Sequence, residues 1–528
     1  MGDRARRPWT GGCSGNVTRV LTEGILFTDH YQLTMAQLYH RYGLADRSAH
    51  FDYLFRSYPD YGSHQAGYCV AAGLGPLVEW MGRTWFGREE RAALREIRSN
   101  NGDRLFGEPF IGWLSRSGGF GSVSIWAVPE GRVVHPNTPV LTVEAPLAIA
   151  QLLETPLLNR LNYATLIATK TSRVVEAAGG TAVMEFGMRR APEAAAAVAT
   201  RSSLIGGAVG SSNFAASYQL GFASKGTHAH SMVQVFMADS GSELDAFRAY
   251  ADVYPDDCLL LVDTIDTLGS GIPNAITVFE ELRRRGHRPV GVRLDSGDLA
   301  HLAIRSAAML DQAGFTEVSI VLSSELDELT IWQIRNQISE EAARYGVEAG
   351  RLLDRLVYGV GTRLATSHGY PSLSGVFKLV AIEDSGGEWA PAIKISETPA
   401  KVPDPGRKRL WRVYDRRGTA NADLVTLDDH DPDERPIRLV HPSRPDVGRT
   451  LTHYEVSEVE SLRVKVLEDG RRAPNDAGDV EAARSRRTAD LARLDPGVRR
   501  LVNPHTYHVS LSPELSDLKQ DLIVGFKG

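Results

Sequence analysis

The stretch "PVGVRLDSGD" at residues 289–298 decides the fold of this chain. A short apolar run ends there in charged and small residues, and a helical pattern follows at 298–313. A short apolar run bounded by turn residues is typical of a buried strand, and a strand followed by a helix is half of a βαβ unit. The stretch therefore predicts a parallel sheet covered by helices.

Comparable segments recur before and after it, several of them separated by helical patterns such as 274–286. They are "TAVMEF" (181–186), "SLIGGAVGSSN" (203–213), 224–231, "CLLLVDTIDT" (258–267), "EVSIVLSSELD" (317–327), "RLVYGVGTR" (355–363) and "SGVFKLVAIE" (374–383). Roughly seven or eight such units favour an irregular TIM-like barrel of parallel strands, with a doubly wound open sheet as the alternative. The active site of such a barrel lies at the carboxyl ends of its strands.

The rest of the chain predicts an α+β domain. Residues 28–42 have the pattern of a helix, 49–55 that of a strand, 120–144 that of a hairpin and 147–178 that of a long helical block. We expect return strands after about residue 400 and a helix within 476–495. The predicted organisation is a disordered leader (1–20), an N-terminal α+β domain (21–150), an α/β barrel (151–395) and a C-terminal segment returning to the N-terminal domain (396–528).

Composition narrows the functional classes. The chain of 528 residues is 42% hydrophobic and 23% charged, with a net charge of −6, which favours neither nucleic-acid nor membrane binding. Its three cysteines have no CxxC spacing, and no apolar run approaches the roughly 20 residues that cross a bilayer. We expect a cytoplasmic protein, and we expect any anionic ligand to be held by a local group of cations.

The ends of the predicted strands carry the candidate chemistry. No P-loop, no dinucleotide-binding glycine fingerprint and no HExxH helix is present in the sequence. The strand ends instead carry arginines, which suit phosphate or carboxylate, and aspartates, which suit Mg²⁺ or ribose hydroxyls. These residues are Arg189, Arg190, Arg293, Arg363, Asp263, Asp266, Asp295 and Asp298, with "YGVGTR" (358–363) as a phosphate-cradling loop.

Two histidines stand out in "GTHAHSMVQVF" (226–236). On a strand, His228 and His230 would point the same way, and this spacing can chelate a transition metal if a third ligand is present. The alternatives are buried structural histidines or a catalytic imidazole whose tautomer a nearby carboxylate fixes. The residues alone leave these three interpretations open.

The motifs, taken together, resemble the nicotinate phosphoribosyltransferase family, which has the type II phosphoribosyltransferase fold. The resemblance covers about residues 24–412. It rests on "TDHYQLTMAQLY" (28–39), "VPEGRVVHPNTPVLTVEAPLAIAQLLET" (128–155), "LNYATLIATKTSRVVEAAGG" (161–180), "EFGMRRAP" (185–192), "GTHAHS" (226–231), "VRLDSGDLA" (292–300), "YGVGTRLATS" (358–367) and "GVFKLV" (375–380).

This resemblance implies an ATP-dependent enzyme of NAD biosynthesis and pyridine nucleotide salvage, of ligase or glycosyltransferase type. It would condense nicotinate with 5-phospho-α-D-ribose 1-diphosphate to give nicotinate mononucleotide and diphosphate. ATP, a co-substrate, would be hydrolysed through a transient phosphohistidine, and Mg²⁺ would accompany the phosphates. A homodimer with shared active sites is also implied, and no direct transition-metal ligand is expected.

The resemblance implies roles for individual residues. The phosphohistidine would be His230, whereas His228 occupies the variable position of the motif. Nicotinate would contact Tyr31 across the dimer interface, together with Thr227 and Arg293, and phosphoribosyl diphosphate would contact Gly361 and Thr362. Arg189, Asp263, Asp295 and Lys378 lie in matching stretches, with roles that the resemblance defines less closely.

One stretch departs from the family pattern, and three other functions compete. Residues 394–408 ("KISETPAKVPDPGRK") resemble the family's Lys-x-Ser…Pro-Gly-Arg-Lys run but carry extra prolines, and the tail after 412 has no recognised counterpart. A nicotinamide phosphoribosyltransferase would share the fold. A metal-dependent barrel hydrolase would use both histidines and an aspartate. An inactive regulatory relative is the third alternative.

Overall fold

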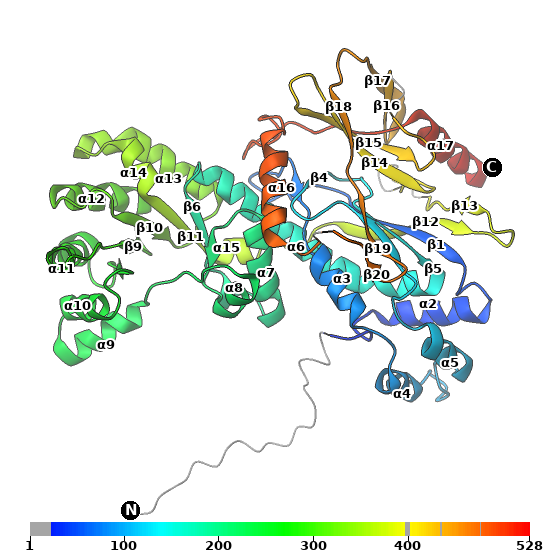
Figure 1. Cartoon of the computed structure of the whole chain (residues 1–528), viewed down its shortest axis with the longest axis horizontal. Helices are drawn as coiled ribbons and strands as arrows, with labels where there is room; N and C mark the ends of the chain where they lie inside the picture. Colours follow the sequence, from blue (N-terminus) through cyan, green and yellow to red (C-terminus); the bar gives the residue numbers. More distant parts are fainter. Residues whose placement is uncertain (1–22, 396–401, 433–435, 476, 528) are drawn as a thin grey trace, which may run out of the picture.

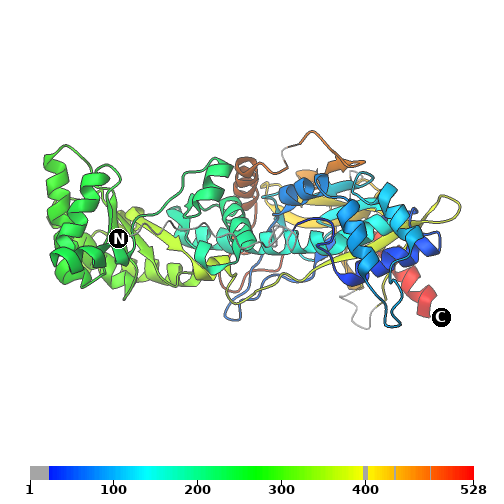
Figure 2. The same cartoon turned by 90° about the horizontal axis from the view of Figure 1, so that it is seen from below.

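The computed structural model describes residues 23–395, 402–432, 436–475 and 477–527 (Figure 1). The predicted leader, residues 1–20, lies outside these ranges. The molecule is elongated, with the parallel sheet and its helices at one end and two further sheets at the other, as the two perpendicular views show (Figures 1 and 2). No helix in the described ranges is both long and apolar enough to cross a membrane.

The parallel sheet confirms the predicted fold class. Its order is β7 (Gly210–Ser211), β6 (Ala182–Glu185), β11 (Leu356–Val360), β10 (Ser319–Ser323), β9 (Gly291–Leu294) and β8 (Leu259–Leu261), and every neighbouring pair is parallel. The sheet curls as a half-barrel of six strands, fewer than the seven or eight units in the sequence pattern. Its central strands are buried on both faces because helices cover them.

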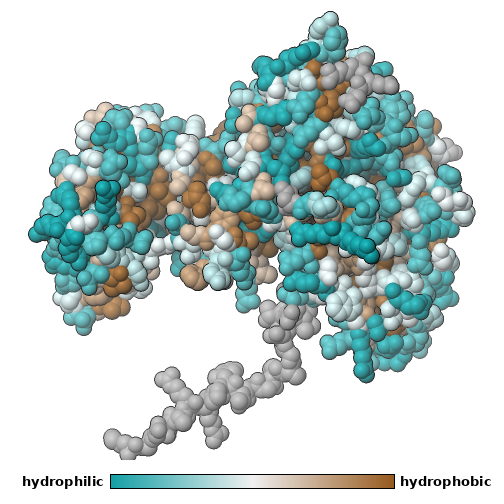
Figure 3. Space-filling model, in the orientation of Figure 1, coloured by the Kyte–Doolittle hydropathy of each residue, from teal (hydrophilic) through white to brown (hydrophobic). Residues whose placement is uncertain are grey.

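Helices on the outer side of this sheet supply the other half of its core. They are α10 (Glu243–Val253), α11 (Ile272–Arg284), α12 (Leu299–Gln312), α13 (Glu328–Glu341) and α14 (Ala349–Arg355), and they lie together at one end of the molecule (Figure 1). Hydrophilic side chains cover most of the outer face there, and apolar side chains gather nearer the middle of the molecule (Figure 3).

Three of the predicted parallel strands are corrected. Residues 203–213 contain the end of helix α7 (Glu193–Ile205) and only the two-residue strand β7. Residues 224–231 form no strand, since only one isolated bridge at Ser224 is present before helix α9 (His230–Ser240) begins. Residues 374–383 do form a strand, β12 (Gly375–Glu383), but it pairs antiparallel with β1 (Ser48–Phe55) in a different sheet.

That second sheet has seven strands and forms the N-terminal half. Its order is β13 (Trp389–Pro391), β12, β1, β5 (Leu141–Pro146), β3 (Ser124–Ala127), β19 (Val464–Glu468) and β20 (Arg471–Arg472). The predicted hairpin is present as the antiparallel pair β3–β5, while β4 (Val133–Val134) leaves it to pair with β2 (Cys69–Val70). Helices α2 (His30–Arg41), α3 (Leu74–Gly82), α4 (Arg88–Glu96) and α5 (Glu108–Ser117) complete this half.

A single long helix connects the two halves. Helix α6 (Leu147–Ala178) has the predicted bounds and packs on α2 and β1 as well as on α13 and β6. Most of its side chains are buried, including the polar Lys170 and Arg173. A helix that is buried nearly all round serves as a shared core element, so α6 sets how the parallel sheet and the N-terminal sheet are oriented.

The C-terminal segment forms a third sheet and returns to the N-terminal half. The sheet order is β17 (Arg444–Leu451), β16 (Ile437–His441), β21 (Val509–Leu511), β15 (Ala420–Leu427), β14 (Lys408–Tyr414) and β18 (Glu458–Ser461). Strands β19 and β20 extend the N-terminal sheet beside β3, while α16 (Val480–Ala492) packs on α7. Helix α17 (Pro513–Lys527) lies against β15 and β16. The domain bounds drawn from sequence remain a prediction.

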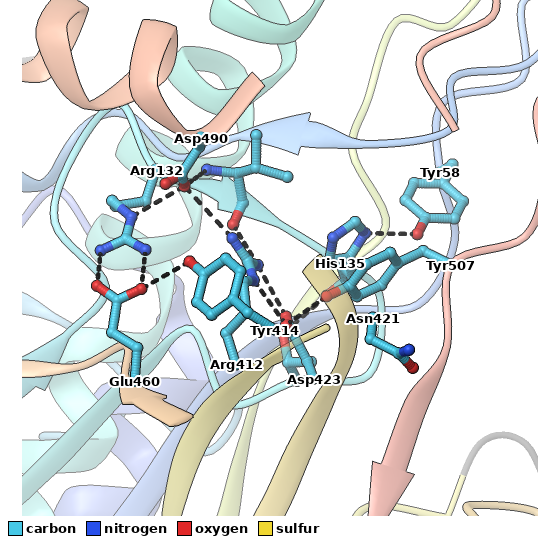
Figure 4. A network of polar contacts seen from close by, with 12 residues as sticks. Tyr58, Arg132, His135, Arg412, Tyr414, Asn421, Asp423, Glu460, Asp490 and Tyr507 are labelled. Carbon is cyan, nitrogen blue, oxygen red and sulfur yellow. Dashed lines mark hydrogen bonds and ion pairs between the residues drawn. The ribbon is translucent and has the colours of Figure 1, made fainter. Parts of the chain in front are cut away.

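A buried network of charges attaches this third sheet to the N-terminal half (Figure 4). The guanidinium of Arg412 donates to both carboxylate oxygens of Asp423, at 2.8 and 2.9 Å, and to Asp490 at 3.3 Å. Arg132 donates to Asp490 at 2.9 Å and forms a double hydrogen bond with Glu460 at 2.7 and 2.8 Å. Because the charges of Arg412 and Asp423 are almost completely buried, loss of either partner would leave the other unpaired.

An aromatic group continues this network. The ring of His135 stacks on Tyr507 with ring centres 3.7 Å apart, and Tyr507 donates to Asp423 at 3.0 Å (Figure 4). Tyr58 contacts Nδ1 of His135 at 2.7 Å. Burial, together with the nearby charge of Arg412, holds the pKa of His135 well below its usual value. His135 is therefore a neutral core residue that joins three segments of the chain.

Candidate active site

The carboxyl ends of the six parallel strands meet at one edge of the sheet, because all six run in the same direction. This edge gathers most of the site residues predicted from sequence. They are Arg189 after β6, Gly361 and Thr362 after β11, Arg293 and Asp295 on and after β9, Asp263 after β8, and Thr227 and His230 in the segment before and at the start of α9.

His230 and Asp263 form a direct pair at this edge. His230 is the first residue of α9, and its Nε2 lies 3.0 Å from Oδ1 of Asp263. The imidazole is 39% exposed, whereas the Asp263 side chain is 2% exposed. A carboxylate accepts hydrogen bonds only, so Nε2 carries the proton in this pair and the neutral ring keeps its lone pair on Nδ1.

The second oxygen of Asp263 fixes the neighbouring strand end. Oδ2 accepts the backbone N–H of Asp295 at 3.2 Å and the hydroxyl of Ser296 at 2.5 Å. Both carboxylate oxygens of Asp263 are thus in use, and the side chain connects the ends of β8 and β9. This leaves Asp263 as an orienting group for His230 and gives it little capacity to bind a ligand.

Arg293 is held by two neighbours and keeps one end free. Its Nε donates to Ser323 at 2.9 Å and its Nη2 to Asp295 at 3.1 Å, and Ser323 itself donates to Asp295 at 2.5 Å. The guanidinium lies 5.7 Å from the centre of the Phe186 ring. Nη1 has no hydrogen bond to a described residue, so an oriented cation remains available for a carboxylate or a phosphate.

His228 has a structural role, and the expectation of two parallel histidines is corrected. Its Nε2 accepts the backbone N–H of Leu261, the last residue of β8, at 3.1 Å, and its ring packs 4.9 Å from that of Tyr250. Burial lowers the pKa of His228 to about 4, so the ring is neutral near pH 7. In the described ranges, no three His, Cys, Asp or Glu side chains are grouped to hold a metal ion.

Comparison with known proteins gives the family. The model of the nicotinate phosphoribosyltransferase (NAPRTase) family matches residues 181–415, and the models of its N-terminal and C-terminal domains match residues 26–162 and 407–519. The chain is 37% identical over 492 residues to nicotinate phosphoribosyltransferase of Bacillus subtilis, with 93% of each chain covered. The chain belongs to the nicotinate phosphoribosyltransferase family.

Two further comparisons, both with a human protein, agree with this assignment. The Homo sapiens nicotinate phosphoribosyltransferase is 32% identical over 565 residues, covering 95% of this chain and 97% of that protein. The crystal structure of human nicotinic acid phosphoribosyltransferase superimposes with a TM-score of 0.74 at 28% identity, covering 94% of this chain and 99% of that one. The similarity to the nicotinate phosphoribosyltransferase family therefore includes the tail after residue 412, for which the sequence motifs gave no counterpart.

The phosphate-binding segment that the family resemblance implies follows β11. Gly361 caps the short helix α15 (Thr362–Ala365), and a Cβ at Gly359 would lie 2.5 Å from the Phe186 ring. Arg363, predicted as a free guanidinium, instead donates to Asp327 at 2.6 Å and contacts Glu325 at 3.4 Å. Arg363 therefore orients this segment through ion pairs, and only its Nη2 is left without a hydrogen bond to a described residue.

Arg189 and Thr227 complete the edge. Arg189 lies in the exposed turn η1 (Met188–Arg190) after β6 and has no ion pair with a described residue. The Thr227 hydroxyl makes only a 3.4 Å contact with the carbonyl of His228. Both side chains are therefore available to a ligand at the strand ends.

Tyr31 and Lys378 are not brought to this edge. Tyr31 lies on α2, which the two views place at the opposite end of the molecule from α9 (Figures 1 and 2), and it is 46% exposed. It lines a cavity of about 350 Å³ together with Tyr163, whose hydroxyl donates to the carbonyl of Ala365 at 2.6 Å. Lys378 lies on β12, with Nζ 3.9 Å from Glu154.

Two site residues escaped the sequence analysis. Ser323 ends the apolar run of β10 and contacts both Arg293 and Asp295. Glu185 ends β6, is 1% exposed, and accepts hydrogen bonds from Thr200 at 3.2 Å and Ser211 at 2.5 Å. The signal for both is a polar residue at the last position of a buried strand, where a polar side chain needs a partner.

Proposed function

We propose that this protein condenses nicotinate with 5-phospho-α-D-ribose 1-diphosphate in NAD biosynthesis. The pyridine nitrogen would attack C1 of the ribose, the bond from C1 to oxygen would break, and diphosphate would leave with the electron pair. The observation that carries the proposal is the pair His230–Asp263 beside the oriented Arg293, in a chain whose family membership covers its length.

Arg293 supports nicotinate over nicotinamide as the substrate. Its guanidinium is oriented by Ser323 and Asp295 and keeps one nitrogen free, which suits a carboxylate better than a neutral amide. A product assay with nicotinate and nicotinamide in competition tests this choice. Preference for nicotinamide would contradict the proposed substrate.

ATP would be coupled through His230. The Nδ1 lone pair would attack the γ-phosphorus of ATP, ADP would leave, and water would later release phosphate from the imidazole. Asp263 supports this step because it holds the proton on Nε2 and stabilises the positive charge that builds on the ring. A phosphate on His230 adds nearly two negative charges beside Arg293 and can thereby change the affinity of the strand ends for substrate.

Mg²⁺ would enter with the phosphates, since it usually binds through one or two carboxylates plus substrate oxygens. The second oxygen of Asp295 has no partner among the described residues, and Asp298 uses one oxygen to cap α12. When bound, Mg²⁺ would neutralise charge on the leaving diphosphate. The chain's own contribution is to orient Asp295 through Ser323 and Arg293.

A homodimer with shared sites is part of the same proposal. Helix α2, which carries Tyr31, and helix α9, which begins at His230, lie at opposite ends of the molecule (Figures 1 and 2), so a contact of Tyr31 with nicotinate would be made across an interface. Phe214 and Tyr218 on α8 (Phe214–Leu220) are 72% and 80% exposed, so α8 offers two neighbouring aromatic rings for such an interface. Mixing Tyr31→Ala and His230→Ala chains should restore part of the ATP-stimulated transfer if sites are shared, and none if each chain works alone.

The remaining expectations stand as part of this proposal. We infer a cytoplasmic enzyme with nicotinate, phosphoribosyl diphosphate and ATP as its ligands and without a nucleic-acid partner. The metal-dependent hydrolase is not favoured, because Nε2 of His228 accepts a hydrogen bond from the backbone of β8. The family assignment also supports transfer chemistry.

A further inference from the structure

A second cavity lies far along the molecule from the edge of the parallel sheet. It lies between the start of β14 and strands β1, β3 and β5 of the N-terminal sheet, and its volume is about 380 Å³. The last residues of the 394–408 stretch form part of its wall. Four cations line the cavity, Arg407, Lys408, Arg409 and Arg463, together with His50 and Trp126.

One of these cations already has its partners. Nζ of Lys408 lies 3.0 Å from Asp52 and donates to the carbonyls of Asp404 at 2.7 Å and Gly406 at 2.6 Å. The side chain is almost completely buried, with 2% exposed. Lys408 therefore anchors β14 to β1 and does not offer its charge to a ligand.

The arginines are left with an excess of positive charge. Arg463 donates to the hydroxyl of Thr142 and to the carbonyl of Lys408, which are both neutral acceptors, and it has no ion pair with a described residue. Arg409 is exposed and is also without an ion pair in the described part of the chain. Among the arginines that line the cavity, only Arg407 forms an ion pair in the described part of the chain, with Asp428 at 3.1 Å. Four cations but only one carboxylate, that of Asp428, are among the described residues that line the cavity, which leaves an excess of positive charge.

Burial makes this arrangement costly in the empty cavity. Desolvation lowers the pKa of Arg463; the carboxylates of Asp52 and Asp428 oppose this shift, and the positive charge of Arg409 adds to it. An anion between the two guanidiniums would act against the lowering, since opposite charges nearby favour the charged form.

The wall of the cavity adds a free imidazole nitrogen and an indole ring. His50 is 5% exposed, with Nε2 bound to Glu144 at 2.6 Å and Nδ1 without a partner among the described residues. Trp126 lines the same cavity, and Nζ of Lys465 lies 5.3 Å from the centre of the Trp126 ring. A flat ring can pack on an indole, while guanidinium forks match phosphate oxygens.

We propose that this cavity is a second ligand site, which binds a nucleotide through its phosphate at Arg409 and Arg463 and through its base at Trp126. The volume falls within the usual range for small-molecule sites. This site is separate from the strand ends that carry His230, and its occupancy does not depend on the proposed reaction. A nucleotide there would bridge β14 and the N-terminal sheet.

The test is a calorimetric titration of the full-length protein with AMP. An Arg293→Gln background weakens AMP binding at the strand ends, so that the cavity is observed separately. We expect one AMP per chain in this background. Adding Arg409→Gln should weaken AMP binding by about tenfold or more, as expected for loss of a charged hydrogen bond. Arg417→Gln, an exposed arginine beside Asp415 in the turn after β14, is the matched control and should leave AMP binding unchanged.

Equal AMP affinity with and without Arg409→Gln would overturn the proposal. So would the absence of AMP binding in the Arg293→Gln background when the wild-type chain binds one AMP. Arg409 is exposed, so its replacement leaves the buried contacts of β14 in place. The Trp126→Leu variant tests the base contact: it should weaken AMP binding but not ribose 5-phosphate binding, and an equal loss for both ligands would contradict a base on Trp126.

Discussion

The Asp263 carboxylate lies 3.0 Å from Nε2 of His230, with its other oxygen bound to the backbone N–H of Asp295 and the hydroxyl of Ser296. This relationship orients the imidazole from a rigid, buried group. It leaves Nδ1 as the atom with the free lone pair.

Asp263→Asn should slow ATP-dependent phosphorylation of His230 by about 10²–10⁴-fold, because the neutral amide no longer stabilises a positively charged ring. Single-turnover measurement of phosphate transferred from labelled ATP gives this rate. Asp479→Asn is the control for the loss of a carboxylate, since Asp479 caps α16, away from this edge, and asparagine caps helices equally well. A similar effect of both changes would remove the special role of Asp263.

Arg293→Ala should weaken nicotinate binding by roughly 2–5 kcal/mol and affect phosphoribosyl diphosphate binding much less. Ser323→Ala removes one of the groups that orient Arg293 and should cost a smaller amount, about 0.5–1.5 kcal/mol, also on nicotinate. Equilibrium binding of each substrate separately provides the comparison. Equal losses for the two substrates would show that Arg293 does not select nicotinate.

Acid should destabilise the protein partly through His228. Its pKa is about 4 in the folded chain against an ordinary value near 6.5, so the unfolded chain takes up a proton first as the pH falls. The contribution of His228 to stability is therefore present above about pH 6.5 and is lost as the pH falls towards 4. Between about pH 6.5 and pH 4, the free energy of unfolding of His228→Gln, measured in urea, should fall less steeply than that of the wild type.

Breaking the Arg412–Asp423 pair should lower the free energy of unfolding by about 3–5 kcal/mol, because a buried charge would lose its partner. Arg412→Met and Asp423→Leu, alone and together, make a double-mutant cycle measured by urea unfolding. The double variant should be more stable than the sum of the two single losses predicts. Additive losses would mean that the two charges do not stabilise each other (Figure 4).

Local patterns predicted the elements well. The helical block at 147–178 has the bounds of α6, and the charged pattern within 476–495 contains α16. The helix after 298 is α12. Asp295, Ser296 and Asp298 are all residue types that cap helices, and the cap is Asp298, whose side chain accepts the N–H of His301. Cap residues cluster in this stretch, so spacing alone does not decide which one bonds the first turn.

Pairing between distant strands was harder to predict. The apolar run at 374–383 has the same pattern as the parallel strands, but its partner β1 lies more than three hundred residues earlier in the chain. The strand-end pattern did place Asp263, Arg293 and Asp295 at one edge of the sheet, where the structure has them. It did not give the partner of Arg363, or the different roles of His228 and His230, because those depend on the course of the loop before α9.

The central claim is that His230 accepts phosphate from ATP. Mass spectrometry of the intact protein after incubation with ATP and Mg²⁺ tests it directly, followed by mapping of the acid-labile phosphate. We predict one phosphate on His230 in the wild-type chain and none on His230→Ala, which should retain slow transfer without stimulation by ATP. Equal phosphate on His230→Ala, or ATP-stimulated transfer with no phosphate on the wild-type chain, would contradict the account.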